Sequence, residues 1–298
     1  MRRTLESVMA QSVPPALWVV VDDGSTDDTP GILEGYRPRM PYLRVVRRAN
    51  RGSRSVGPGV IEAFYAGLET VALAEFDYLC KLDLDLPPRY FELLMARMEA
   101  NPRLGTTSGK PYFIGASGGR LVAEVCGDEM SVGMTKFYRV QCFRDIGGFV
   151  RQVMWDGIDC HRCRLLGWVA ESVDNEALRF IHLRPMGSSQ KGIWTGRIRS
   201  GYGQYFMGTA PVYLLASAIF RLPKHPVVAG SIAMIWGYAS SALRGLERYN
   251  DLEFRKFLRS YQYTCLLLGK SRATRKFNDA QAVVWRARTA PQVGGFGS

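Results

Sequence analysis

An apolar run that ends in two carboxylates constrains this chain more than any other feature. Phe76-Asp77-Tyr78-Leu79-Cys80 has the composition of a strand, and Pro87-Pro88 prevents its continuation. Asp83 and Asp85 are therefore predicted at a strand's carboxyl end. Residues i and i+2 of an extended segment project to one side, so both carboxylates can face a Mg²⁺ or Mn²⁺ ion with positions open for phosphate oxygens. Two solvated aspartates in a turn are the alternative for this motif taken alone.

A second apolar run also ends in acidic residues. Leu17-Trp18-Val19-Val20-Val21 suits a parallel strand buried on both faces, and Asp22 and Asp23 follow it. Gly24 permits a tight turn, and Thr29-Pro30 is typical of a helix start. Open α/β sheets place ligands at strand carboxyl ends in this arrangement of strand, turn and helix. An acidic capping loop is the alternative for the later aspartates of the turn.

The two motifs together, strand-VDDGSTDDT and strand-LDLD, resemble the nucleotide-sugar half of family 2 glycosyltransferases with the GT-A fold. The resemblance implies that Asp22 and Asp23 contact the nucleobase and ribose. It implies that Asp83 and Asp85 hold the divalent metal on the diphosphate, with Asp83 also at the donor nucleotide. We therefore expect an α/β domain over residues 1–205, in which helices flank a mostly parallel central sheet.

A basic loop lies between the two motifs. Residues 43–46 read as a short strand, and five arginines fall within eleven residues around it and after it. Guanidinium groups pair well with phosphate oxygens, although a solvated surface role is the alternative for any one of them. The family's loop has Asn-x-Gly followed by Arg, which implies Asn50 and Arg54 as nucleotide contacts. Apolar residues at helical spacing from Pro58 to about Leu73 predict the crossover helix into the metal strand.

The catalytic carboxylate is expected in the second half of the domain. Residues 135–149 resemble the family's strand and Gly-Gly-Phe segment that precede this carboxylate. Asp156 lies at the family position, although Trp155 replaces the usual Glu. An inverting transfer removes the acceptor hydroxyl's proton during attack on the anomeric carbon, so a carboxylate must lie across from the metal. Asp156 is the predicted general base and Asp159 the reserve, with an N-cap role as the alternative for Asp156.

The surrounding acceptor half is less regular. Residues 105–113 read as a weak strand and residues 121–134 as a helix. Three carboxylates on or near one face of that helix are the next candidates for the base: Glu124, Asp128 and Glu129. Cys160-His161-Arg162-Cys163 has no second pair of ligands at finger spacing, which favours helical packing over a zinc site.

Two later segments are expected near the donor. His182 ends an apolar strand and is similar to the family's late histidine, which implies a metal ligand; a structural histidine is the alternative. Residues 187–208 are rich in glycine and read as a mobile loop over diphosphate and acceptor. This loop carries Trp194, Arg197 and Arg199, and Trp194 suits either stacking on a sugar or ordinary packing.

The remainder, residues 206–298, reads as a basic, partly apolar helical region. Its apolar runs at 210–220 and 227–243 are shorter than the roughly 20 residues that a spanning helix needs. With the basic residues of 244–276 they suit an anionic membrane surface or a tail packed on the catalytic domain. Thirty-nine Lys and Arg against 27 Asp and Glu give a net charge of +12, which indicates an anionic partner. Scattered cysteines without a secretory signal predict a cytoplasmic protein. The membrane alternative for the tail would make it peripheral on the cytoplasmic face of the membrane.

The resemblance implies an inverting, metal-dependent hexosyl- or related transferase for polysaccharide, glycolipid or cell-envelope glycan synthesis. The expected partners are a nucleotide-diphospho-sugar donor, with UDP-sugars favoured, and a glycan or lipid-linked acceptor; nucleic acid is not expected. Family members usually begin with an apolar strand before the helix represented here by Arg2 to Gln11. We therefore expect a chain truncated at its amino terminus, without the first nucleotide-binding strand. A non-catalytic nucleotide-sugar binder or a metal-dependent nucleotidyltransferase is the alternative.

Overall fold

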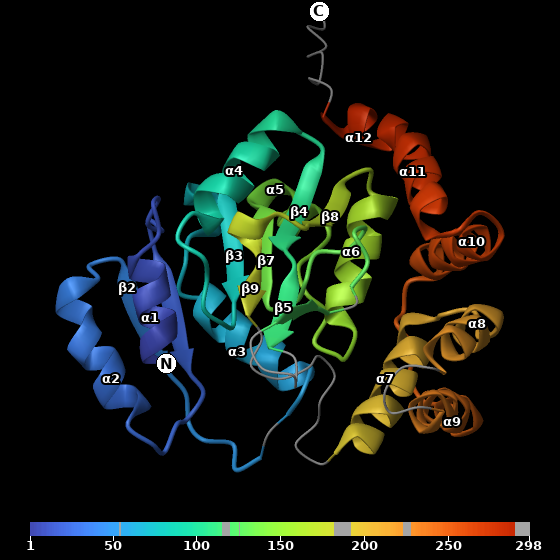
Figure 1. Ribbon diagram of the computed structural model, residues 1–298, viewed down its shortest axis with the longest axis horizontal. Helices are drawn as coiled ribbons and strands as arrows, with labels where there is room; N and C mark the ends of the chain where they lie inside the picture. Colours follow the sequence, from blue (N-terminus) through green and yellow to red (C-terminus); the bar gives the residue numbers. More distant parts are fainter. Residues whose placement is uncertain (54, 115–119, 125, 182–191, 223–227, 290–298) are drawn as a thin grey trace, which may run out of the picture.

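The computed structural model describes residues 1–53, 55–114, 120–124, 126–181, 192–222 and 228–289. In Figure 1, strands and helices alternate through the first part of the chain, and helices alone form the last part along one side. The strands are β1 Trp18–Asp22, β2 Leu43–Arg47, β3 Tyr78–Leu82, β4 Leu104–Gly109, β5 Pro111–Ile114, β6 Leu121–Ala123, β7 Thr135–Arg139, β8 Val169–Val173 and β9 Phe180–Ile181. The helices are α1 Arg2–Met9, α2 Thr29–Tyr36, α3 Pro58–Leu68, α4 Tyr90–Ala100, α5 Val140–Asp145, α6 Trp155–Leu165, α7 Ile193–Met207, α8 Pro211–Arg221, α9 Ala229–Leu243, α10 Leu252–Leu268, α11 Lys270–Ala280 and α12 Ala282–Thr289.

The strands form three hydrogen-bonded groups. β1 pairs with β2, a central group has the order β3-β7-β4-β8, and β5 lies between β6 and β9. The expectation of a mostly parallel sheet needs correction, because β7 runs antiparallel to both β3 and β4. An apolar pattern is the same in either chain direction, and a strand between two others pairs with both whichever way it runs. The α/β class itself, with helices on the sheet and a helical C-terminal region, is as predicted.

Helices cover both faces of the amino-terminal strands. Leu5 and Val8 of α1 pack with Leu33 of α2 and with the half-buried Trp18 on one face of β1. On the other face α3 approaches closely, since a Cβ at Gly67 would lie 2.8 Å from a methyl group of Val21. Successive side chains of a strand point to opposite faces, so β1 is enclosed between α1 and α3.

The segment expected as a helix over residues 121–134 is not helical. Residues 121–123 form β6, which pairs antiparallel with β5 in the register Tyr112↔Ala123. The described residues that follow make turns before β7, and the expected weak strand at 105–113 is divided into β4 and β5. Strand pairing with β5 overrides the local helical preference here, which single-sequence patterns do not capture.

The expected mobile loop over residues 187–208 also needs correction, because its described part is largely helix α7. Glycines allow α7 to pack directly on α9: a Cβ at Gly201 would lie 2.0 Å from the Met234 carbonyl oxygen. Likewise, a Cβ at Gly237 would lie 2.1 Å from the Ile198 carbonyl oxygen. These glycines serve the close approach of two backbones, which is the other common use of the residue.

The C-terminal helices pack on the α/β unit. Phe254 and Leu258 of α10 form a buried cluster with Ile158 of α6. Arg103 donates from Nη2 to the Asn278 carbonyl oxygen at 2.7 Å, which joins α11 to the loop before β4. Among the described helices, none has both the length and the apolar character to cross a bilayer. The division of the chain at residues 205 and 206 stays a prediction, and α7 runs across it.

Candidate active site

The acidic turn after β1 is held by its own residues. The Ser25 backbone N–H donates to Asp22 Oδ1 at 2.8 Å, and Arg47 Nε lies 3.5 Å from Asp22 Oδ2. Burial opposes ionisation of this carboxyl group, but the Ser25 hydrogen bond and Arg47 outweigh it and lower the pKa of Asp22. The Asp22 side chain is only 2% exposed, so it stabilises the turn. Asp23 is more accessible and forms ion pairs with two cations of the basic loop, Arg48 at 2.7 Å and Arg51.

The basic loop lies directly against this turn. Asn50 Nδ2 donates to the Gly24 carbonyl oxygen at 2.8 Å, and Asn50 Oδ1 accepts from the Gly52 N–H at 2.7 Å. Gly24 has φ +84°, and a Cβ there would lie 2.4 Å from the Asn50 Cα. Only glycine satisfies both conditions, so the predicted turn chemistry and the predicted Asn50 meet in one contact. Arg54, the other predicted nucleotide contact of this loop, lies outside the described residues.

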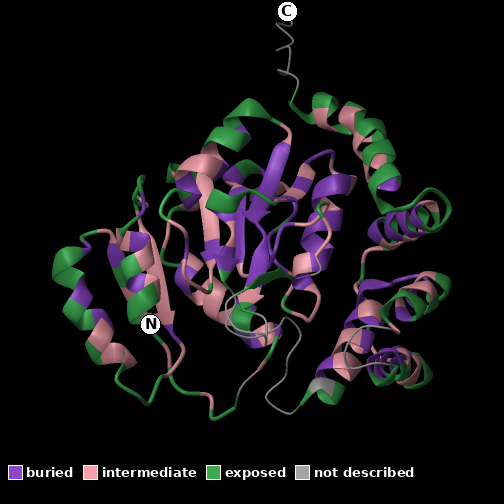
Figure 2. Cartoon of the chain, in the orientation of Figure 1, coloured by how far each residue is buried: buried purple, intermediate pink, exposed green. Residues whose placement is uncertain are grey.

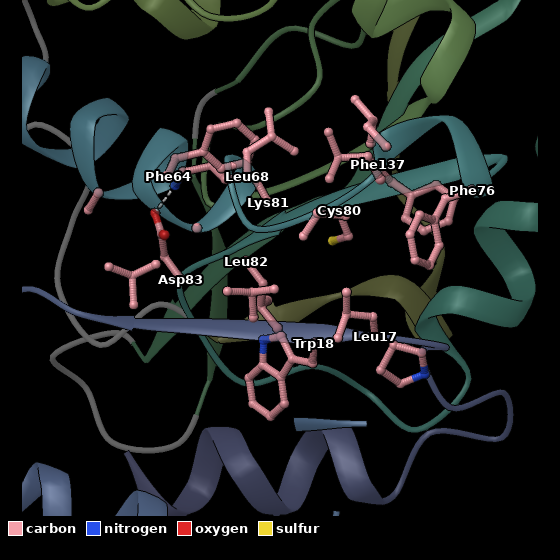
Figure 3. A pocket seen from close by; sticks show the side chains of 18 of the residues that line it. Leu17, Trp18, Phe64, Leu68, Phe76, Cys80, Lys81, Leu82, Asp83 and Phe137 are labelled. Atoms are coloured by element: carbon pink, nitrogen blue, oxygen red, sulfur yellow. Dashed lines mark hydrogen bonds and ion pairs between the residues drawn. The ribbon is translucent and has the colours of Figure 1, made fainter. Parts of the chain in front are cut away.

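Asp83 follows β3 directly, and the buried ammonium group of Lys81 binds its carboxylate. The Asp83 N–H donates to the Met134 carbonyl oxygen at 2.9 Å, while its side chain is 46% exposed. Lys81 Nζ binds the Asp83 carboxylate and donates to the Gly133 carbonyl oxygen at 3.1 Å. Lys81 is only 5% exposed, and Figure 3 shows its side chain directed toward Asp83. The carboxylate is thereby oriented and still open to a ligand.

Two residues of the amino-terminal helix α1 contact the Asp85 carboxylate. Thr4 Oγ1 donates to Asp85 Oδ1 at 2.8 Å, and Arg3 Nε lies 3.1 Å from Asp85 Oδ2. Within the described part of the chain, no three Asp, Glu, His or Cys side chains converge as a metal cage. Two carboxylates at one strand end nevertheless suit Mg²⁺ or Mn²⁺, which commonly takes its other ligands from phosphates and water. His182, the third predicted ligand, lies outside the described residues.

Asp156 lies beside the same turn that holds Asp83. It occupies the first turn of α6 and is half-buried. A Cβ at Gly133 would lie 3.0 Å from Asp156 Oδ2, so the carboxylate rests against the peptide that accepts from Lys81. Asp156 and Asp83 therefore both lie next to the short segment of residues 133–134. No side-chain capping bond is made at the start of α6, so the structure gives Asp156 no N-cap role.

Trp155, which stands where the family usually has Glu, contacts two buried lysines. Lys81 Nζ lies 5.2 Å from the indole ring centre, and Lys136 Nζ lies 5.8 Å from it. A ring face attracts cations without adding a formal charge. The neutral indole thus lies between the ammonium group that binds Asp83 and the one that binds α6.

Asp159, the reserve base, is a structural residue. Its carboxylate lies 2.6 and 2.7 Å from Lys136 Nζ and also accepts from the Tyr138 hydroxyl. Asp159 is 1% exposed and Lys136 is fully buried. Burial works against the charge on the ammonium group, but the neighbouring Asp159 carboxylate outweighs it and raises the pKa of Lys136. A carboxylate so enclosed has no path to an acceptor hydroxyl, so the reserve assignment is corrected.

The other predicted groups lie apart from this centre or play other roles. Glu129 pairs with Lys270 at 2.6 Å, Asp128 pairs with Lys110 at 2.7 Å, and Glu124 is buried after β6. On α7, Trp194 is 50% exposed, and Arg197 and Arg199 are half-buried on the same helix. His161 is buried against the Tyr261 ring, and burial together with Arg164 lowers its pKa.

The geometry can be set beside known proteins. Residues 1–122 match the family model described as glycosyl transferase family 2. The match agrees with the resemblance to family 2 glycosyltransferases and covers less than half of the chain. The predicted family is supported over these residues alone, and the α/β class of the fold is confirmed by the strands and helices described above. The family 2 match ends before Asp156, so the predicted base lies outside it. No curated protein matches the chain.

The solved structures to which this chain is similar include two transferases. One is mannosyltransferase PcManGT from Pyrobaculum calidifontis in complex with GDP-Man and Mn²⁺, at 17% identity and TM-score 0.47, over 97% of this chain and 83% of that one. The other is GalNAc-T7 with UDP, GalNAc and Mn²⁺, at 12% identity and TM-score 0.49, over 82% of this chain and 52% of that one.

The sequence analysis did not identify three residues of the candidate site. Lys81 and Lys136 each interrupt an otherwise apolar or uncharged strand segment, and a lysine is rarely buried unless it is paired. That interruption was the available signal, since it predicts a carboxylate partner within reach. Trp155 was noted only as a departure from the family, and its place between the lysines depends on tertiary packing.

The structural role of Asp159 gives a stability prediction. Asp159→Ala leaves the Lys136 ammonium buried without its carboxylate and should destabilise the fold by about 3–5 kcal/mol. The double change Asp159→Ala with Lys136→Met removes the stranded charge and should recover most of that loss. Urea unfolding of the three chains measures both effects. Equal stability of the single and double variants would contradict the buried pair.

Proposed function

We propose that this protein is an inverting, metal-dependent glycosyltransferase that moves a sugar from a nucleotide-diphospho-sugar to an acceptor hydroxyl. The arrangement of Asp83, Lys81, Gly133 and Asp156 carries the proposal. It brings a strand-end carboxylate open to a ligand and a half-buried second carboxylate next to the same short segment. The match of residues 1–122 to the model of glycosyl transferase family 2 supports the same function.

The donor would bind along the carboxyl ends of β1 and β3. Asp23, with Arg48 and Arg51 paired to it, supplies the nucleoside side, and the arginines can exchange their carboxylate partner for phosphate oxygens. Asp83 and Asp85 would hold Mg²⁺ or Mn²⁺, which when bound neutralises charge on the leaving diphosphate. We propose a UDP-sugar as the donor and a glycan or lipid-linked hydroxyl as the acceptor.

Asp156 would take the acceptor proton. Its carboxylate is half-buried, lies at the start of α6 and forms no ion pair with another described residue, unlike that of Asp159. The Lys136 ammonium donates to the Asp156 carbonyl oxygen at 3.0 Å, which fixes the backbone from which the carboxylate projects. A positioned base of this kind contributes typically 10²–10⁴-fold to a proton transfer.

The metal site gives a binding prediction. UDP affinity should rise when Mn²⁺ is added, because the cation is the largest local charge at the diphosphate. Asp85→Ala should remove most of that increase, whereas Asp128→Ala, on a distant exposed carboxylate, should leave it intact. Titration calorimetry with UDP and GDP, with and without Mn²⁺, measures this without turnover. A UDP affinity that stays the same when a chelator is added would contradict the proposed role of the metal.

The base assignment gives a prediction that separates rate from binding. Asp156→Asn keeps the side chain's shape but removes the proton acceptor, so turnover should fall roughly a hundredfold or more while donor affinity changes little. Donor binding by calorimetry and transfer by product formation are measured on the same protein. Near-normal transfer by Asp156→Asn would refute the assignment. If the parent chain binds the donor but transfers no sugar, the alternative of a non-catalytic nucleotide-sugar binder would hold instead.

We also propose that the C-terminal helices rest on an anionic membrane surface at its cytoplasmic face. Apolar side chains recur at helical spacing on the outer faces of two neighbouring helices, and Figure 2 colours those faces as exposed. They are Val212, Leu215, Ile219 and Phe220 of α8 and Ile232, Trp236 and Leu243 of α9. A pair of such helices suits the interface between headgroups and acyl chains. Six cysteines, none in a disulfide, agree with a reducing compartment.

Vesicle flotation tests this surface. The parent chain should float with vesicles that contain phosphatidylserine, and the bound fraction should fall as salt screens the basic residues. Trp236→Glu should reduce binding severalfold, whereas Leu267→Glu on α10, equally apolar and 83% exposed, should not. Equal partitioning to neutral and acidic vesicles would contradict the electrostatic part. Equal loss in both variants would contradict the assignment to α8 and α9.

A further inference from the structure

A small pocket on helix α10 lies apart from the acidic strand ends. It measures about 240 Å³, and its lining consists of one leucine and four cationic residues: Arg248, Leu252, Arg255, Lys256 and Arg259. In Figure 1, α10 lies on the opposite side of the central strands from β1 and β2. The pocket is therefore separate from the proposed donor site.

Helix α10 has one buried face and one cationic face. Phe254 and Leu258 are fully buried in the cluster that they form with Ile158 of α6. Residues 252, 255, 256 and 259 follow the spacing i, i+3, i+4 and i+7, so they share another face of the helix. Arg255 and Arg259 are four residues apart, and like charges at this spacing destabilise a helix. The cationic face therefore costs stability for as long as no anion is bound to it.

The protein supplies no negative charge to this face. Among the described residues, no acidic one lines the pocket. None of the four cations forms an ion pair with a carboxylate in the part of the chain that the structure describes. The Asp251 carboxylate, just before α10, accepts from the Phe254 N–H at 2.8 Å and so caps the helix. The positive charges of the pocket are thus left for a ligand.

Neutral groups hold two of the guanidinium groups in place. Arg259 Nε donates to the carbonyl oxygen of Gly208, the residue at the end of α7, at 3.2 Å. Arg248, in the turn between α9 and α10, lies over the Tyr205 ring at 4.4 Å from its centre. Neither contact neutralises a charge, and a guanidinium has further N–H donors beyond Nε. Both side chains are therefore positioned but still able to bind an anion.

Arg255 gives a second indication of a ligand. Its Nε is buried and has no hydrogen-bond partner among the described residues. Its stem packs against Gly208, where a Cβ would lie 2.7 Å from Arg255 Cγ and Cδ. Gly208 also has φ +89°, so glycine is needed there both for the backbone and for this contact. A buried N–H without an acceptor costs free energy, and an oxyanion in the adjoining pocket would supply an acceptor.

We propose that this pocket binds the phosphoryl group of a phosphate or diphosphate ester. Planar guanidinium groups match the oxygens of such a group, and the Lys256 ammonium adds charge from the same face. A carboxylate would bring one negative charge to four cations, whereas a phosphate monoester brings about two. The volume lies below the roughly 300 Å³ at which pockets for drug-sized molecules begin. It therefore suits a headgroup and excludes a whole nucleotide-sugar.

The phosphoryl group can belong to a soluble ester or to a lipid headgroup, since both present the same oxygens to the pocket. In either case a bound group would join three segments: the end of α7, the turn that holds Arg248, and α10. Binding should therefore stabilise the fold in proportion to its affinity. This inference requires neither sugar transfer nor the proposed membrane surface of α8 and α9.

The soluble source is tested with inorganic phosphate and inorganic diphosphate. Both are titrated calorimetrically with EDTA present, so that metal-dependent binding at Asp83 and Asp85 does not contribute. The parent chain should bind diphosphate more tightly than phosphate, and diphosphate should raise its melting temperature. Arg255→Gln with Lys256→Gln should weaken diphosphate binding by roughly tenfold or more, because two charge-assisted contacts are lost.

A matched control removes the same charge elsewhere. Arg272→Gln with Arg275→Gln changes two exposed cations of α11 outside the pocket, and diphosphate affinity should stay within about twofold. Lys256→Gln alone changes an exposed side chain and leaves the packing of Arg255 on Gly208 intact. It should still weaken binding severalfold, which keeps the test valid if the double change in the pocket disturbs folding.

The lipid source is tested by flotation with two kinds of vesicle of equal surface charge. Phosphatidic acid presents a phosphate monoester, and phosphatidylserine presents a phosphodiester with a carboxylate. If a headgroup occupies the pocket, the parent chain should prefer the phosphatidic acid vesicles, and Arg255→Gln with Lys256→Gln should remove this preference. Trp236→Glu, which probes the α8–α9 surface, should lower binding to both kinds alike.

Diphosphate binding or a preference for phosphatidic acid, lost in the pocket variants and kept in the α11 variant, would support the proposal and identify the source. A parent chain that shows neither would overturn it. Equal losses in the pocket and α11 variants would also overturn it, because net charge alone would then explain the binding. No readout uses a nucleotide, a metal or sugar transfer, so a failure here is distinct from a failure of the proposed function.

Discussion

Two buried ammonium groups on one indole ring fix the catalytic half of the molecule. Lys81 and Lys136 come from neighbouring strands, and both lie within 6 Å of the centre of the Trp155 ring. Burying an ammonium ion costs several kcal/mol unless its partners are in place. Asp83 and Asp159 are those partners, so the end of β3, the turn before β7 and the start of α6 must take up one mutual arrangement. The geometry of the proposed site follows from this electrostatic requirement.

The sequence predicted the residues at the strand ends because their signals are local. An apolar run followed by Asp-x-Asp and two prolines placed Asp83 and Asp85 at the end of β3, and the crossover helix α3 followed from periodicity. The difference between Asp156 and Asp159 could not be predicted in this way. They lie three residues apart on one helix, and the residue that decides between them, Lys136, comes from another strand. Which carboxylate is enclosed depends on that distant pairing.

The predictions that rested on glycine residues were the least reliable ones. Gly24 was correctly assigned to a tight turn, where its positive φ and the contact with Asn50 both require it. The glycines of α7 were read as part of a mobile loop, yet Gly201 of α7 and Gly237 of α9 allow two helix backbones to touch. The residue is the same in both settings, since it supplies either backbone freedom or the absence of a side chain. Only the partner across the contact distinguishes the two uses, and a single sequence does not reveal it.

The separation of β1 and β2 from the central sheet has a consequence for local unfolding. A two-stranded sheet is marginal by itself, and here no strand-to-strand hydrogen bond ties it to β3 within the described chain. Its order rests on α1, α2 and α3, and on loop contacts such as Thr4 with Asp85. We therefore expect the β1–β2 segment to be a cooperative unit of its own that opens at a lower free energy than the β3-β7-β4-β8 core. The part of the proposed site that would bind the nucleoside, at the end of β1, would then lie on the segment that opens first. The part that carries the proposed base, on α6 beside the central sheet, would lie on the segment that opens last.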